Sequence, residues 1–146
     1  MKKLVIILLS IVTLSSCSIN DDDSPEIEYE LAAITGNDLP DTFELGESYT
    51  ITLNYLLPSQ CHSFAALDAR RASNSGDERR QIYVAAVSNF ISNAQCNEDV
   101  VGNAGTTTFN ILIDETEDYK FYFWTGFDAE DKPIYTEVSV PVTEGL

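Results

Sequence analysis

Beyond residue 26, apolar and polar residues alternate along short segments of the chain. The clearest segment covers residues 48–56, where Tyr49, Ile51 and Leu53 alternate with Thr50 and Thr52. A period of two, in segments rich in Thr, Val, Ile, Tyr and Phe, predicts β-strands with one buried face. Strands are expected over residues 26–33, 48–56, 60–70, 79–90, 106–113, 119–125 and 134–142.

One of these segments is ambiguous. Within residues 79–90, Tyr83, Ala86, Val87 and Phe90 also fit helical spacing, and adjacent alanines favour a helix. We expect a strand, because Ile82 and Val84 alternate with their neighbours and because the turn at residues 74–77 suits a hairpin.

About seven strands, with turns every 8–12 residues, predict an all-β fold built as a two-sheet sandwich. The spacing of Gly46, the strand at 48–56 and the final pair of Tyr-rich strands resembles immunoglobulin-like and fibronectin-type modules. This resemblance implies an antiparallel β-sandwich but no particular activity. Pro141 has no N–H for a sheet ladder, which places the last strand at a sheet edge.

The N-terminal segment has the features of a secretion signal. Lys2 and Lys3 precede an apolar run over residues 4–14 that is too short to span a bilayer comfortably. The following Leu14-Ser15-Ser16-Cys17 resembles the lipobox of bacterial lipoproteins, which implies cleavage before Cys17 and a lipid such as palmitate on its thiol. The alternative is an ordinary signal peptide with an incidental cysteine. The predicted parts are a signal peptide (1–16), a lipidated acidic tether (17–26) and an immunoglobulin-like β-sandwich domain (27–146).

An acidic run, Asp21-Asp22-Asp23, follows the cysteine. It resembles the export signal behind the lipidated cysteine of Bacteroidota surface lipoproteins, and the whole chain resembles small lipoproteins of that group. The resemblance implies a protein anchored in the outer membrane and facing the cell exterior. The alternative is a solvated spacer that faces the periplasm.

The domain is strongly acidic. The chain has 8 Lys and Arg against 24 Asp and Glu, a formal net charge of −16, and removal of Lys2 and Lys3 with the signal makes it −18. Phosphate backbones are bound by clustered Lys and Arg, so this charge excludes nucleic acid as a partner.

The three cysteines divide into one lipid site and one pair. With Cys17 acylated, Cys61 and Cys96 remain as an even pair in an oxidising compartment, and a hairpin between them brings both to the same end of the sandwich. We therefore predict a Cys61–Cys96 disulfide, which contributes roughly 3–4 kcal/mol on the chain-entropy model. A free catalytic thiol is the alternative.

Candidate chemistry is sparse, and neither catalytic residues, metal ligands nor a cofactor are predicted. His62 is the only histidine and lacks the companions of a zinc site, so we interpret it as an ordinary loop or strand residue. Acidic clusters lie at residues 21–23, 114–118 and 128–131, but none has the spacing of a calcium loop, and the last two are expected at opposite ends of a sandwich.

Two surfaces are candidate binding sites. The first is a cationic turn that could bind an acidic ligand, against the alternative of a rim neutralised by Asp68, Asp77 and Glu78. The second lies opposite Phe121 and Phe123 and, if exposed, could bind a sugar or a protein, against the alternative of a core or partly buried position. Their residues are Arg70, Arg71, Arg79 and Arg80 for the turn, and Tyr122 and Trp124 for the face.

The leading functional hypothesis is a non-enzymatic binding module, held to the membrane by its lipid, with an unidentified protein or carbohydrate ligand. The second is a structural or accessory subunit of an envelope complex, marked by a large exposed apolar patch. The third is a hydrolase, for which His62 would have to lie beside a carboxylate and a serine in a pocket.

Overall fold

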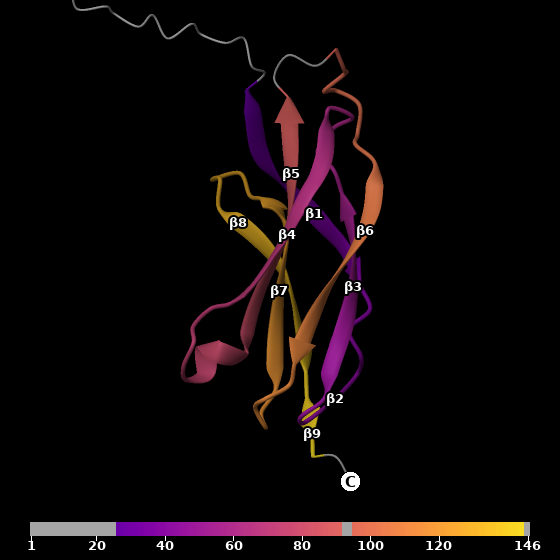
Figure 1. The fold of residues 1–146 in the computed structure, drawn as a ribbon. Helices are drawn as coiled ribbons and strands as arrows, with labels where there is room; N and C mark the ends of the chain where they lie inside the picture. The colour runs from indigo at the N-terminus through magenta and orange to yellow at the C-terminus, as the bar shows by residue number, and fades with distance from the viewer. Residues whose placement is uncertain (1–25, 92–94, 145–146) are drawn as a thin grey trace, which may run out of the picture.

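The computed structural model describes residues 26–91 and 95–144, and these form strands and one short 3₁₀ helix (Figure 1). Nothing in those two stretches forms a helix long and apolar enough to cross a membrane. The elements are β1 (Ile27–Asn37), β2 (Phe43–Glu44), β3 (Ser48–Leu56), β4 (His62–Arg71), η1 (Asp77–Arg80), β5 (Gln81–Ile91), β6 (Ala104–Leu112), β7 (Tyr119–Phe127), β8 (Pro133–Val140) and β9 (Val142–Thr143).

The strands form two layers that share β1. Hydrogen-bonded neighbours follow the order β6-β3-β1-β5-β7-β8, and β4 pairs with the other side of β5. The first half of β1 pairs with β5, up to Ala32, and the second half pairs with β3 from Ala33 onward. The register between β1 and β3 shifts between Ile34 and Gly36, so β1 bends from one layer into the other.

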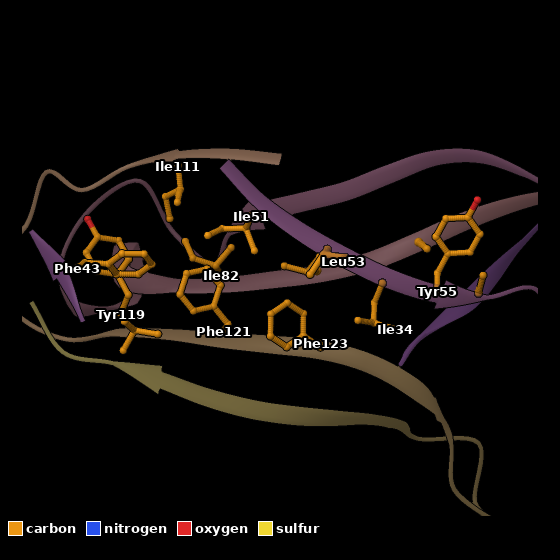
Figure 2. Close-up of a cluster of buried hydrophobic side chains, with 14 of the residues drawn as sticks. Ile34, Phe43, Ile51, Leu53, Tyr55, Ile82, Ile111, Tyr119, Phe121 and Phe123 are labelled. Carbon is orange, nitrogen blue, oxygen red and sulfur yellow. The ribbon is translucent and has the colours of Figure 1, made fainter. Parts of the chain in front are cut away.

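The core lies between the layers and is built mainly from the inward-facing side chains of β1, β3, β5, β6 and β7 (Figure 2). Ile51 and Leu53 of β3 face Phe121 and Phe123 of β7 across this space, and all four side chains are buried. Phe43 closes one end of the core, where β2 pairs in parallel with β9.

The predicted all-β sandwich of about seven strands is confirmed, and β3 has the predicted bounds. Of the ambiguous segment 79–90, residues 79 and 80 end η1 and the rest is a strand and not an α-helix, since residues 81–91 pair with β4 on one side and with β1 and β7 on the other. The sheet is mixed and not purely antiparallel, because β5 and β7 run parallel. In immunoglobulin domains the third strand lies in one sheet with the last two. Here β5 lies between β4 and β7, and β4 is at the edge of the sheet.

The connection between β4 and β5 differs from the predicted turn. The chain passes through residues 72–76 and then forms η1, so Arg79 and Arg80 precede β5. Arg70 and Arg71 pair in register with Tyr83 and Ile82. The two arginine pairs therefore do not lie opposite one another in the β4–β5 ladder.

The predicted disulfide is confirmed at one pole of the sandwich. Cys61 and Cys96 are bonded, with Cα atoms 5.4 Å apart, within the usual range for a disulfide. β1 begins at this pole, because Ile27 pairs with Ile91, next to the pairing of Phe90 with His62. The β4–β5 connection with η1 lies at the opposite pole (Figure 1).

Candidate functional site

Trp124 lies on the side of β7 that faces away from the core, at a β-bulge. Trp124 pairs with Tyr135 of β8 and Gly126 pairs with Ile134, so Thr125 is the extra residue of the bulge. Such bulges re-aim side chains and are common beside functional sites. The Trp124 side chain is only 6% exposed, which confirms the core or partly buried interpretation.

The indole N–H of Trp124 is a buried donor that finds no hydrogen-bond partner within the described part of the chain. A buried donor without an acceptor costs about 1–3 kcal/mol, and buried polar groups are therefore nearly always paired. The Trp124 N–H is therefore an exception among the buried polar side-chain groups of the described residues.

Three tyrosines surround this position on the outer side of the sheet. Tyr83 and Tyr122 are in register on the parallel strands β5 and β7, and their rings stack with centroids 4.7 Å apart. Tyr135 of β8 meets both rings edge to face, at 5.4 Å and 6.5 Å. We call Tyr83, Tyr122, Trp124 and Tyr135 the outer aromatic face.

Two adjoining depressions share Trp124 and Leu31 as walls. The larger is a groove of about 320 Å³ between β1, the loop after β3 and the loop before β6, lined by Leu57, Pro58 and Val101, with Glu30 also on its wall. The smaller, of about 130 Å³, is lined by Tyr83, Tyr135, Asp68 and Arg70. Trp124 thus separates an apolar groove from an aromatic pocket that carries one acid and one base.

The four arginines of the predicted cationic turn are not equivalent. Arg71 bonds the Asp114 carboxylate at 3.1 Å, and Arg79 bonds both Asp114 and Glu115. Arg80 bonds Asp77 and Glu117. Only Arg70 is largely exposed, at 74%, and its partner Asp68 lies 3.6 Å away on the outer side of the sheet.

The turn is therefore a neutralised rim, in which Asp68 and Asp77 act as predicted but most partners come from the segment before β7. Sequence reasoning missed Asp114, Glu115 and Glu117 because β5 and β6 separate them from the arginines along the chain. In the sequence, the acidic run at 114–118 and the basic turn are two separate features. In the structure they form one ion-pair network.

Asp114 is the centre of this network. Its carboxylate also accepts a hydrogen bond from the Tyr119 hydroxyl at 2.9 Å. Partial burial acts to raise the pKa of Asp114, but the Tyr119 hydrogen bond and the charges of Arg71 and Arg79 outweigh it and hold the pKa below its usual value. Burial raises the pKa of the Tyr119 hydroxyl.

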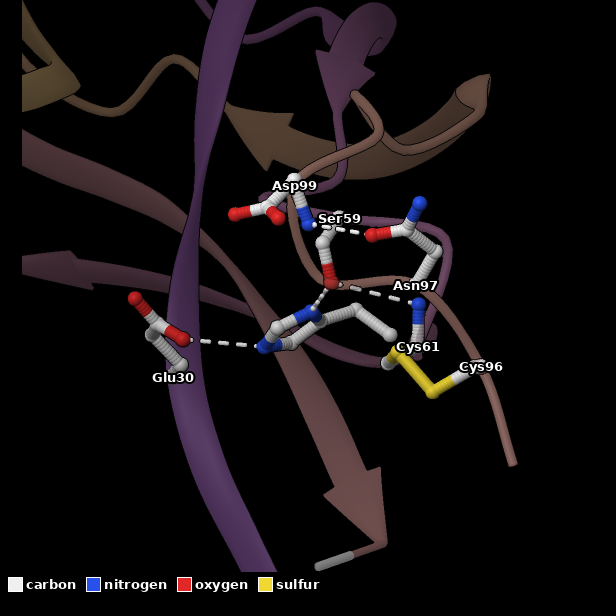
Figure 3. Close-up of a disulfide and its surroundings, with 7 residues drawn as sticks. Glu30, Ser59, Cys61, Cys96, Asn97 and Asp99 are labelled. Carbon is white, nitrogen blue, oxygen red and sulfur yellow. Dashed lines mark hydrogen bonds and ion pairs between the residues drawn. A yellow bond between two sulfur atoms is a disulfide. The ribbon is translucent and has the colours of Figure 1, made fainter. Parts of the chain in front are cut away.

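A serine–histidine–carboxylate chain lies beside the disulfide (Figure 3). The hydroxyl of Ser59 is 2.8 Å from Nδ1 of His62, and Nε2 of His62 is 2.9 Å from the Glu30 carboxylate. In the neutral imidazole the carboxylate accepts from Nε2–H, so the Ser59 hydroxyl donates to Nδ1. Sequence reasoning found His62 but not its partners, and the Ser-x-x-His spacing across a turn was the available local signal.

The Ser59 hydroxyl is too buried for a substrate to reach it as a nucleophile. Ser59 is 4% exposed, and its hydroxyl also accepts from the Cys61 N–H at 3.2 Å. The backbone of Gly102 packs against the turn that carries Ser59, so closely that a Cβ there would lie 2.5 Å from the Ser59 carbonyl oxygen. The arrangement fixes the turn that leads into the disulfide, and neither depression described above is lined by Ser59 or His62.

The remaining acidic loop is held by local bonds. Asp128 accepts backbone N–H bonds from Glu130 and Lys132, as in an Asx-type turn. Within residues 26–91 and 95–144, no three metal-ligating side chains gather in one place.

Cys17 and Asp21–Asp23 lie outside the described residues. Comparisons of the chain with protein-family models, with curated proteins and with solved structures gave no match.

Proposed function

We propose that the protein is a lipid-anchored, surface-displayed binding module that acts without catalysis and takes its ligand on the outer aromatic face. One observation carries the proposal: Trp124 forms the wall between two open depressions, and within residues 26–91 and 95–144 its buried indole N–H finds no acceptor. Aromatic side chains with a polar tip are the residues that most often anchor ligands and partners.

The anchor part of the proposal rests on the sequence. Leu14-Ser15-Ser16-Cys17 supports lipidation, and Asp21–Asp23 supports transfer to the cell exterior. Because β1 starts at the disulfide pole, a tether ending at residue 26 joins the domain at that pole. The outer aromatic face then lies along the side of the domain, open to a ligand that approaches parallel to the membrane.

The arginine turn supports binding less well. Three of its four side chains hold carboxylates of the same chain, so an anionic ligand would have to displace existing ion pairs. Arg70 is the exception, and it lies in the pocket of the outer aromatic face.

A second function, an accessory subunit of an envelope complex, also has a specific observation in its favour. Phe127, Ile134 and Tyr135 are large apolar side chains exposed around the β7–β8 hairpin, and β8 is an edge strand. Apolar side chains beside an unpaired strand edge are typical of a protein interface.

The test measures how strongly the parent protein and its variants bind to intact cells of the producing organism. The mature chain carrying Cys17→Ser, labelled at its N-terminus, is added to the cells, and bound fluorescence is measured at increasing salt. We expect saturable binding with little salt dependence, and strong weakening by the double variant Tyr83→Ala/Tyr135→Ala. The matched control is Tyr29→Ala, because Tyr29 is an exposed tyrosine that lines neither depression.

Equal binding by the double variant and the parent, with both folded, would overturn the placement of the site. Steep weakening with salt would instead favour an electrostatic site. Removal of binding by protease treatment of the cells would show that the ligand is a protein and not a carbohydrate.

A further inference from the structure

We infer that the ligand of the outer aromatic face is a neutral oligosaccharide that lies across Trp124, with one sugar ring in the aromatic pocket and the next in the groove. This inference rests on the proposed function and names the chemical class of its ligand.

The pocket has the two kinds of wall that a sugar ring requires. A pyranose has apolar C–H faces and a rim of hydroxyl groups, so it is bound by an aromatic surface together with donors and acceptors at the edge. Tyr83 and Tyr135 supply the aromatic surface, at nearly perpendicular orientations. Asp68 and Arg70, 3.6 Å apart, supply an acceptor and a donor.

The indole N–H provides the second, independent observation. Trp124 is more than nine-tenths buried, and among the described residues its Nε1 has no acceptor. Because Nε1 has no exposed surface, a hydroxyl or ring oxygen of a ligand satisfies it only when the Trp124 side chain turns toward the boundary of the two depressions, and that contact would recover most of the cost of an orphaned donor. Purely apolar ligands would leave it unsatisfied.

Charge favours a neutral ligand. The domain has a strongly negative formal charge, so acidic polysaccharides meet repulsion at long range. At the pocket itself Asp68 and Arg70 are paired, which leaves no uncompensated charge to select an ion. Both side chains are substantially exposed, so they can exchange their mutual contact for hydroxyl groups at little cost.

The groove is the reason that we infer a ligand longer than one sugar. It adjoins the pocket through Leu31 and Trp124, and its walls at Leu57, Pro58 and Val101 are apolar. Glu30 adds one carboxylate to this wall, and His62 holds that carboxylate at 2.9 Å. A chain of two or more sugars fits both depressions, whereas a single sugar fills only one.

The experiment uses the single tryptophan of the chain, which is Trp124. Its fluorescence is recorded in the mature Cys17→Ser chain during titration with neutral hexasaccharides of glucose, xylose, mannose and N-acetylglucosamine, and with an acidic galacturonic acid hexamer. At least one neutral hexamer is expected to give a saturable change, and the matching monosaccharide is expected to bind at least tenfold more weakly.

Variants then test the roles of the named groups by calorimetry. Trp124→Phe keeps an aromatic ring and removes the N–H, and it should weaken binding about three- to tenfold. Tyr135→Ala should weaken binding by at least as much, whereas Tyr29→Ala should leave it unchanged.

The inference is overturned if no neutral hexamer gives saturable binding, or if the acidic hexamer binds better. In the first case, loss of cell binding by variants of the outer aromatic face shows that this face binds a ligand of another kind, so the proposed function stands without the carbohydrate. If cell binding is also independent of that face, both fail.

Discussion

Replacing Asp114 with Asn keeps the size of the side chain and removes the negative charge at the centre of the ion-pair network. The carboxylate holds Arg71 at 3.1 Å, Arg79 and the Tyr119 hydroxyl, and its side chain is 28% exposed. Exposed ion pairs contribute about 0.2–1 kcal/mol and hydrogen bonds to charged groups about 1.5–3 kcal/mol. For a partly buried centre with three partners we expect a loss of about 1–2 kcal/mol in the free energy of unfolding at pH 7.

The pH dependence of this loss follows from the lowered pKa of Asp114. A carboxyl whose pKa is lower in the folded than in the unfolded state stabilises the fold above its unfolded pKa, near 3.9, and loses that contribution as pH falls through the folded pKa. The difference between parent and Asp114→Asn should therefore be full at pH 5–7 and should shrink below pH 4.

The assay is unfolding in urea followed by circular dichroism at pH 7, 4 and 3. Urea is chosen because guanidinium chloride is a salt and would screen the ion pairs. Asp77→Asn is the control, since Asp77 also pairs with an arginine but its side chain is 93% exposed. A loss of equal size at pH 3 and pH 7, or an Asp77→Asn loss as large as that of Asp114→Asn, would refute the reasoning.

Four further predictions concern the disulfide pole and the N-terminal segment. Reduction of the Cys61–Cys96 bond should lower the free energy of unfolding by roughly 3–4 kcal/mol, and non-reducing mass spectrometry of the native protein should recover the linked peptides; two freely alkylated thiols would contradict it. Cys17→Ser should abolish incorporation of labelled fatty acid and release the protein from membranes, and replacement of Asp21–Asp23 by Ala should reduce access of external protease on whole cells while leaving lipidation intact. A fluorophosphonate probe should leave Ser59 unlabelled in native protein, and stoichiometric labelling would revive the hydrolase hypothesis.

The alternation of apolar and polar residues was sufficient to predict most of the strands. The alternation of residues 48–56 predicted β3 with its observed bounds, because one face of that strand packs entirely on the core. The hairpin between Cys61 and Cys96 was also predictable, because the even cysteine count and the two strands led to the same pole.

The alternation of apolar and polar residues could not predict which strands pair when they are far apart in the sequence. A period of two shows which side of a strand is buried but not which strand lies beside it, so the parallel pairing of β5 with β7 and the bend of β1 between layers had no local signal. The same limit hid the ion pair of Arg79 with Asp114 and the placement of Glu30 beside His62. Tyr122 and Trp124 were predicted to share a face, but the sequence did not indicate that Trp124 would be buried and Tyr122 only partly buried.

The most direct measurement of the central claim is the indole N–H resonance of Trp124 in a ¹H–¹⁵N spectrum of the mature Cys17→Ser chain. The chain has one tryptophan, so this resonance reports on the proposed site alone. On addition of surface material extracted from the producing cells, we predict that the indole resonance and the amide resonances of Tyr83 and Tyr135 shift, while the amides of β6 and of residues 48–53 of β3 stay in place. An unchanged indole resonance under conditions where the protein binds that material would contradict the account.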